Sequence, residues 1–181
     1  MKAAVITFPG SNCDRDLAVA LQNAGAQVTR VWHKDQDLPE GTDLVGVPGG
    51  FSFGDYLRCG AIAAHSPIAA ALRRHAERGG YLLGICNGFQ VLTELGLLPG
   101  ALMRNSALTF ICKPATLNVL TTDSAFTAGY RKGQQIGIPV AHHDGNYQIT
   151  PDGLARLQDG DRIAFTYGPA INGSVGDIAG I

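Results

Sequence analysis

The chain has 181 residues, a formal net charge of -1 and 45% hydrophobic residues. The balanced charge argues against a nucleic-acid or anionic-membrane partner, and the apolar content excludes a disordered chain. The short apolar start (residues 1–8) is too brief for a signal peptide or a membrane span. The four cysteines are scattered and lack a metal-type spacing, which favours reduced thiols. We therefore expect a cytoplasmic protein with no metal site.

Short apolar runs alternate with helical patterns in the first half of the chain. The expected strands are 3–8, 27–32, 43–48 and 81–85, and the expected helices are 14–24, 67–78 and 87–95. Ser66 and Pro67 have the residue types of an N-cap and a first helical position, and His75 is expected on the surface of that helix. The alternation predicts an α/β fold, with a doubly wound, mainly parallel sheet covered by helices on both faces.

The pattern changes beyond residue 105. Four shorter runs with a more antiparallel character are expected at 110–120, 135–140, 147–150 and 162–167. No linker or repeat separates the two halves, so we expect a single domain over residues 1–181. The last residues, 177–181, resemble the opening of a strand, and we therefore expect that a C-terminal segment is missing.

One motif carries a specific chemistry. Gly84-Ile85-Cys86-Asn87-Gly88 lies between an expected strand and an expected helix, in the Gly-x-nucleophile-x-Gly arrangement of a nucleophile elbow. Such a turn holds the nucleophile in a strained backbone conformation, and the glycines remove clashes where strand and helix crowd together. We expect the helix N-terminus to lower the pKa of the Cys86 thiol. For the other three cysteines we expect ordinary roles: Cys13, Cys59 and Cys112.

A second glycine motif ends the preceding strand. Pro48-Gly49-Gly50 would lie beside the elbow in a doubly wound sheet, where a glycine can turn a backbone N–H toward a developing oxyanion. Taken by itself, this motif is equally typical of a simple strand-ending turn.

These motifs together resemble class I glutamine amidotransferases, which implies a flavodoxin-like sheet. The resemblance rests on residues 48–58 (PGGFSFGDYLR) and 84–90 (GICNGFQ). More narrowly, four further segments resemble the family of glutaminase subunits of phosphoribosylformylglycinamidine synthase: 8–14 (FPGSNCD), 97–100 (LLPG), 104–105 (RN) and 165–168 (FTYG). The similarity extends over essentially the whole chain.

The resemblance implies a mechanism and a set of site residues. Cys86 would attack the side-chain amide of glutamine and form a thioester, releasing ammonia. Gly50 and Asn87 match the backbone oxyanion donors, and Gln90 matches a position that contacts the amino-acid end of glutamine. Residues 141–145 (AHHDG) match a segment that touches substrate through its backbone, so His142 is included, although the family often has glycine at His143.

The family also implies partners. The ammonia would pass to a large synthase subunit, which uses ATP and Mg to convert formylglycinamide ribonucleotide to formylglycinamidine ribonucleotide in purine biosynthesis. A small accessory subunit is expected too, and no cofactor is expected in this chain. The family completes its triad with a C-terminal His-Pro-Glu motif, which residues 1–181 lack, so we expect weak glutaminase activity from these residues alone.

Two other functions stay open. A thiol hydrolase of the related glyoxalase-like group shares the elbow, but many of its members have histidine directly after the nucleophile, where this chain has Asn87. A catalytically silent module that docks on a synthase subunit is the second. A flavodoxin-type FMN binder is disfavoured because residues 9–14 lack a Ser/Thr-rich phosphate loop.

Overall fold

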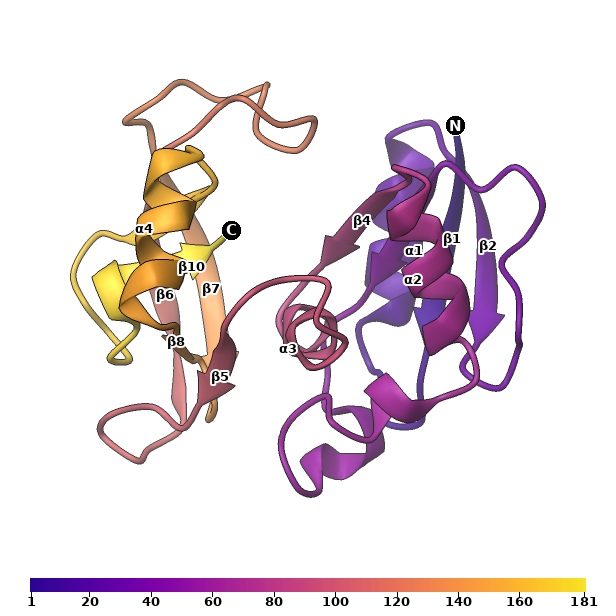
Figure 1. The fold of residues 1–181 in the computed structure, drawn as a ribbon, viewed down its shortest axis with the longest axis horizontal. Helices are drawn as coiled ribbons and strands as arrows, with labels where there is room; N and C mark the ends of the chain where they lie inside the picture. Colours follow the sequence, from indigo (N-terminus) through magenta and orange to yellow (C-terminus); the bar gives the residue numbers. More distant parts are fainter. The chain divides into compact units, whose positions relative to one another are not determined.

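The computed structural model describes all residues from 1 to 181, and it divides into two compact units, Met1–Leu98 and Pro99–Ile181 (Figure 1). The division into two compact units does not test the expectation of a single domain, which stays a prediction. None of the helices is both long and apolar enough to cross a lipid bilayer.

The first unit contains a four-stranded parallel sheet (Figure 1). Its strands are β1 (Lys2–Thr7), β2 (Gln27–Trp32), β3 (Leu44–Val47) and β4 (Tyr81–Gly84), in the order β2-β1-β3-β4. The chain moves from β1 to β2 on one side and then to β3 on the other. The loops after β1 and β3 therefore diverge at the carboxyl edge of the sheet, where open α/β sheets place their sites.

Helices cover both faces of this sheet. They are α1 (Asp14–Asn23), α2 (Ala69–Glu77) and α3 (Asn87–Glu94), with the 3-10 turns η1 (Ser52–Asp55) and η2 (Ala63–His65). Val5 packs with Leu17 of α1 on one face. Ile6, the next residue of β1, joins the larger core formed with α2 and α3 on the other face, because successive strand side chains alternate. The predicted doubly wound α/β fold is confirmed.

Two local expectations for the second helix are wrong. Ser66 is not its N-cap, because α2 begins at Ala69 after Ile68, which makes no side-chain capping bond. His75 is fully buried rather than on the surface. Its Nε2 lies 3.0 Å from the Tyr81 carbonyl oxygen, and Arg78 donates to its Nδ1 at 2.8 Å. These bonds satisfy both ring nitrogens, which is what makes burial of an imidazole tolerable.

The second unit is antiparallel, as the sequence predicted (Figure 1). One sheet has the order β10-β9-β6-β7 and a smaller one pairs β5 with β8. The strands are β5 (Ala101–Met103), β6 (Ile111–Val119), β7 (Gln135–His142), β8 (Asn146–Gln148), β9 (Phe165–Tyr167) and β10 (Ile178–Gly180), with the 3-10 turn η3 (Val175–Asp177) before β10.

The sequence interpretation missed one helix of this unit, α4 (Pro151–Asp159). Its start has a regular signal. Thr150 accepts a hydrogen bond from the Gly153 N–H at 3.2 Å, and Pro151 occupies the first turn. Thr and Pro are favoured residue types for an N-cap and a first helical position, so the sequence did contain the information.

Candidate active site

Cys86 occupies the turn between β4 and α3. Its backbone has φ 53° and ψ -110°, and its carbonyl oxygen accepts from the Gln90 N–H at 3.2 Å, which starts the helix. A positive φ of this kind costs a residue with a Cβ on the order of 1–3 kcal/mol. The predicted strained position between strand and helix is confirmed.

The elbow glycines are required by close packing. A Cβ on Gly84 would lie 2.8 Å from the carbonyl carbon and oxygen of Gly88. A Cβ on Gly88 would overlap the carbonyl oxygen of Val47, at the end of the neighbouring strand β3. Since both obstacles are backbone atoms, no rotamer change could relieve them. The spacing read from the sequence therefore has the mechanical cause that was inferred for it.

The electrostatics of the thiol differ from the expectation. Burial raises the pKa of the Cys86 thiol, and this outweighs the hydrogen bonds from the backbone N–H groups of Asn87 and Gly50, which lower it. Electrostatic interactions with Cys13 and Asp55 raise this pKa further. Although Cys86 is exposed by its surface area, enough protein surrounds the sulfur to disfavour the thiolate. The prediction of a lowered thiol pKa is wrong.

Both N–H groups that were matched to oxyanion donors thus point at the sulfur. Gly50 has φ +128°, and a Cβ there would lie 2.8 Å from the backbone nitrogen of Asn12. The following residues are tied to the loop after β1: Phe51 N–H donates to the Gly10 carbonyl at 3.3 Å, and Phe53 N–H to the Pro9 carbonyl at 2.6 Å. This loop therefore holds Gly50 in a conformation that only glycine adopts readily.

Gln90 lies one helical turn after Cys86 and is buried. Its Oε1 accepts a hydrogen bond from Asn87 Nδ2 at 3.0 Å. The first unit thus brings together four of the predicted site residues: Cys86, Gly50, Asn87 and Gln90. Their catalytic and binding roles stay predictions.

Cys13 is a neighbour of this site that the sequence interpretation set aside. A Cβ placed on Gly49 would be 3.4 Å from Cys86 Cβ and 3.7 Å from Cys13 Sγ, so Gly49 lies beside both cysteines. The available signal was topological. Cys13 follows β1, and β1 pairs with β3, which in turn pairs with the strand before Cys86. The ends of these strands must therefore lie close together.

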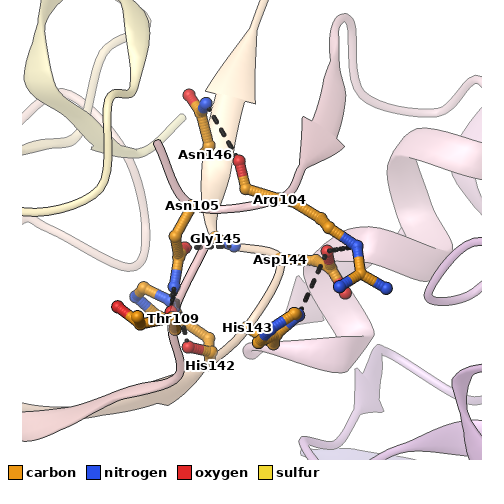
Figure 2. Close-up of polar contacts among 8 residues, drawn as sticks. All are labelled: Arg104, Asn105, Thr109, His142, His143, Asp144, Gly145 and Asn146. Atoms are coloured by element: carbon orange, nitrogen blue, oxygen red, sulfur yellow. Dashed lines mark hydrogen bonds and ion pairs between the residues drawn. The ribbon is translucent and has the colours of Figure 1, made fainter. Parts of the chain in front are cut away.

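The remaining predicted residue, His142, lies in the second unit, at the end of β7 (Figure 2). Its neighbour Asn105 is wholly buried. Asn105 Nδ2 donates to the carbonyl oxygens of Thr109 and His142, both at 2.9 Å. Its Oδ1 accepts from the Gly145 N–H at 3.1 Å and lies 3.0 Å from His142 Nδ1.

This pattern determines the tautomer of His142. Because two carbonyls and a backbone N–H orient the Asn105 amide, its oxygen faces His142, and His142 Nδ1 must carry the proton. Its Nε2 is buried without a hydrogen-bond partner, and burial lowers the pKa of His142. The side chain is therefore neutral and held against Asn105, so a contact of this segment with substrate would involve its backbone, as the resemblance implied.

A second buried asparagine holds the same segment from the other side. Asn172 Nδ2 donates to the Gly145 carbonyl at 2.7 Å, and Ser174 Oγ donates to Asn172 Oδ1 at 2.8 Å. Both polar groups of Gly145 are thus bonded to asparagine side chains. The sequence interpretation used Asn105 only as part of the family resemblance and gave neither Asn105 nor Asn172 this role, because an asparagine in a loop is ordinarily a turn residue.

His143, the other unusual residue of the segment, is partly exposed. Its Nδ1 lies 3.9 Å from Asp144 Oδ1, and Arg104 Nε lies 3.8 Å from the same oxygen (Figure 2). Exposed pairs at such distances contribute little to stability. Among residues 1–181, no group of three or more His, Cys, Asp or Glu side chains lies close enough together to hold a metal ion.

The sequence model of the CobB/CobQ-like glutamine amidotransferase domain matches residues 1–181. The chain belongs to this glutamine amidotransferase family. The resemblance to class I glutamine amidotransferases is thereby confirmed.

Individual amidotransferases of this family are also similar to the chain. Phosphoribosylformylglycinamidine synthase subunit PurQ of Cereibacter sphaeroides is 73% identical over 181 residues, which is all of this chain and 82% of the relative. The same subunit of Roseobacter denitrificans is 68% identical with the same coverage. In the solved structure of PurLQS from Thermotoga maritima, one chain superposes with a TM-score of 0.89 at 44% identity, covering 98% of this chain and 79% of that one.

Proposed function

We propose that this chain is the glutaminase subunit of a phosphoribosylformylglycinamidine synthase, and that Cys86 is its nucleophile. The observation that carries the proposal is the elbow, where a strained cysteine receives hydrogen bonds from the backbone N–H groups of Gly50 and Asn87. The relatives that carry this subunit's name match the chain from end to end. A structural role alone would not account for a strained, surface-accessible thiol between two donors.

In this mechanism Cys86 Sγ attacks the side-chain amide carbon of glutamine, and the carbonyl electrons move to the oxygen. Gly50 and Asn87 then donate to that oxyanion. The carbon–nitrogen bond breaks, ammonia leaves with a proton, and water hydrolyses the resulting thioester to glutamate. Gln90 would contact the amino-acid end of glutamine, as the resemblance implies.

The raised pKa of the Cys86 thiol adds a requirement. At neutral pH the free chain holds mostly the thiol, so a base must accept its proton as the sulfur attacks. The histidine of the family's triad, oriented by its glutamate, would take this proton and return it to the departing ammonia.

The proposal includes partners. The ammonia would pass to a large ATP- and Mg-using synthase subunit, which makes formylglycinamidine ribonucleotide, and a small accessory subunit would complete the assembly. The name of the Thermotoga maritima structure, PurLQS, supports an assembly of this kind. All four cysteines are free, which suits a reducing compartment such as the cytoplasm.

Labelling and turnover together test the nucleophile. A glutamine-analogue electrophile should label Cys86 ahead of the other three cysteines, as read by peptide mapping. In the complex with the synthase subunit, Cys86→Ser should reduce glutamate release to background. The same complex should still form product from added ammonium, since the acceptor step does not need Cys86.

Cys112→Ser is the matched control, because Cys112 is also free and exposed but lies on β6. It should keep both labelling and glutamate release. Labelling mainly at another cysteine would reject the assignment. A wild-type complex that uses ammonium but never glutamine would favour the silent docking module instead.

A further inference from the structure

The side chain of Asn87 has no part in the mechanism above, yet it is among the most completely buried polar groups of the first unit, with 1% of its surface exposed. It makes three hydrogen bonds. Its Oδ1 accepts from the Ser52 N–H at 3.2 Å, and its Nδ2 donates to Asp55 Oδ1 at 3.3 Å and to Gln90 Oε1 at 3.0 Å. The first two bonds cross 35 and 32 residues of sequence.

The partners leave the amide only one orientation. A carboxylate oxygen cannot donate a hydrogen bond, so the group facing Asp55 must be the NH₂. A backbone N–H cannot accept one, so the group facing Ser52 must be the oxygen. A flipped Asn87 would place like groups together at both contacts.

The bond to Ser52 connects the two halves of the oxyanion hole. Ser52 lies two residues after Gly50, whose N–H faces Cys86 from the β3 side. Asn87 contributes the other N–H from the start of α3. The Ser52–Asn87 bond therefore ties the segment that carries one donor directly to the residue that carries the other.

The segment needs such a tie because its backbone is strained. Phe53 and Asp55 have φ values of 53° and 56°, and Leu57 has 69°. Each such residue costs energy relative to a relaxed loop and persists only where surrounding contacts hold it. A second tie lies farther along, where Arg58 donates to Glu94 of α3 through Nε and Nη2 at 2.9 and 2.8 Å. Of these two ties to α3, the Asn87 bond is the one nearer to Gly50.

We propose that the Asn87 side chain is a positioning residue, which holds the Gly50 N–H at a fixed place relative to the Asn87 N–H so that both meet one oxyanion. This rests on the proposed glutaminase function of Cys86. The backbone N–H of Asn87 donates to the oxyanion, whereas its side chain acts through Ser52 on Gly50.

Two substitutions remove the same bond from opposite ends. Asn87→Ala keeps the backbone donor of residue 87 and removes the acceptor, and Ser52→Pro removes the donor N–H at a position where a turn begins. In the complex with the synthase subunit, each should lower kcat for glutamate release about 10²-fold, as for loss of one oxyanion donor. KM for glutamine should change little. The kcat of the double variant should be no lower than that of the more impaired single variant, because both single substitutions break the same interaction.

A second readout is independent of turnover. Misplacing the Gly50 N–H removes one of the two bonds that favour the Cys86 thiolate, while Cys13 and Asp55 still oppose it. The pH midpoint of Cys86 alkylation by iodoacetamide, followed on the Cys86 peptide, should therefore move upward in both variants. Asn23→Ala, an asparagine change at the exposed end of α1, should move neither the midpoint nor kcat.

The outcomes separate the two proposals. Unchanged kcat and an unchanged midpoint in folded Asn87→Ala would overturn the positioning role, and so would a drop in kcat that is additive with Ser52→Pro. If Asn87→Ala does not fold, Ser52→Pro alone decides by the same criteria. A midpoint that moves upward in both variants, together with a wild-type complex that releases no glutamate, would retain the tie and reject the glutaminase function.

Discussion

The two units of the chain hold their functional segments by different means. In Met1–Leu98 the interior is a continuous apolar core, and the elbow is shaped by backbone atoms packed against glycines. In Pro99–Ile181 one apolar cluster is formed by Ala115, Leu117 and Tyr167. There the segment around Gly145 is held by buried asparagine side chains.

This difference shows what kind of precision each unit achieves. A close backbone contact cannot relax by changing a rotamer, so the elbow is rigid as long as its glycines remain. An amide network is directional but depends on every partner, and losing one leaves buried polar groups unpaired. The elbow should therefore be most sensitive to added atoms and the segment around Gly145 to removed ones.

The largest effect is expected from Gly88→Ala. Its Cβ would overlap the Val47 carbonyl oxygen, and because backbone must move, the loss should reach about 3 kcal/mol of unfolding free energy. Gly137→Ala in β7 is the control, since a Cβ there meets nothing within 4 Å. Urea unfolding measures both. Equal stability of the two variants would show that the elbow tolerates the added atom and would contradict the proposed rigidity of the elbow.

An intermediate effect is expected from Asn105→Ala. It leaves the Gly145 N–H and two carbonyls without their partner, which should cost the second unit about 2 kcal/mol. Amide hydrogen exchange at Gly145 should become faster. Asn118→Ala, which removes an exposed bond to Gln135, should change neither quantity. Unaltered exchange in Asn105→Ala would mean that the segment is held by other contacts.

The smallest effect is expected from Tyr147→Phe in the same unit. Tyr147 donates to the Pro99 carbonyl at 2.8 Å, and losing this bond should cost about 1 kcal/mol. Burial raises the pKa of Tyr147 to about 12, whereas an unfolded tyrosine titrates near about 10. The folded state thus keeps this proton longer, and stability should fall as pH rises from about 10 to 12. Tyr147→Phe should lessen that alkaline loss, and an equal loss in both proteins would contradict the assignment.

Much of the first unit could be predicted from the sequence, because its rules are local. Apolar runs of four to six residues alternate with helical spacing, and the observed strand bounds lie close to the expected ones. The elbow spacing around Cys86 was enough to predict its strained position. The second unit was predicted less well. Its antiparallel strands were expected, but α4 was missed despite its Thr150-Pro151 start.

The sequence by itself determined the fold class and the place of Cys86, because strand–helix alternation and the elbow spacing are local patterns, and its resemblance to class I glutamine amidotransferases indicated the family. Only the tertiary structure decided the sign of the Cys86 pKa shift, which depends on how much protein surrounds the sulfur. It alone also decided the distant partners of Asn87 and Asn105, which lie 32 to 40 residues away in the sequence. An amide side chain has no periodicity that identifies a distant partner, so these contacts exist only once the chain has folded.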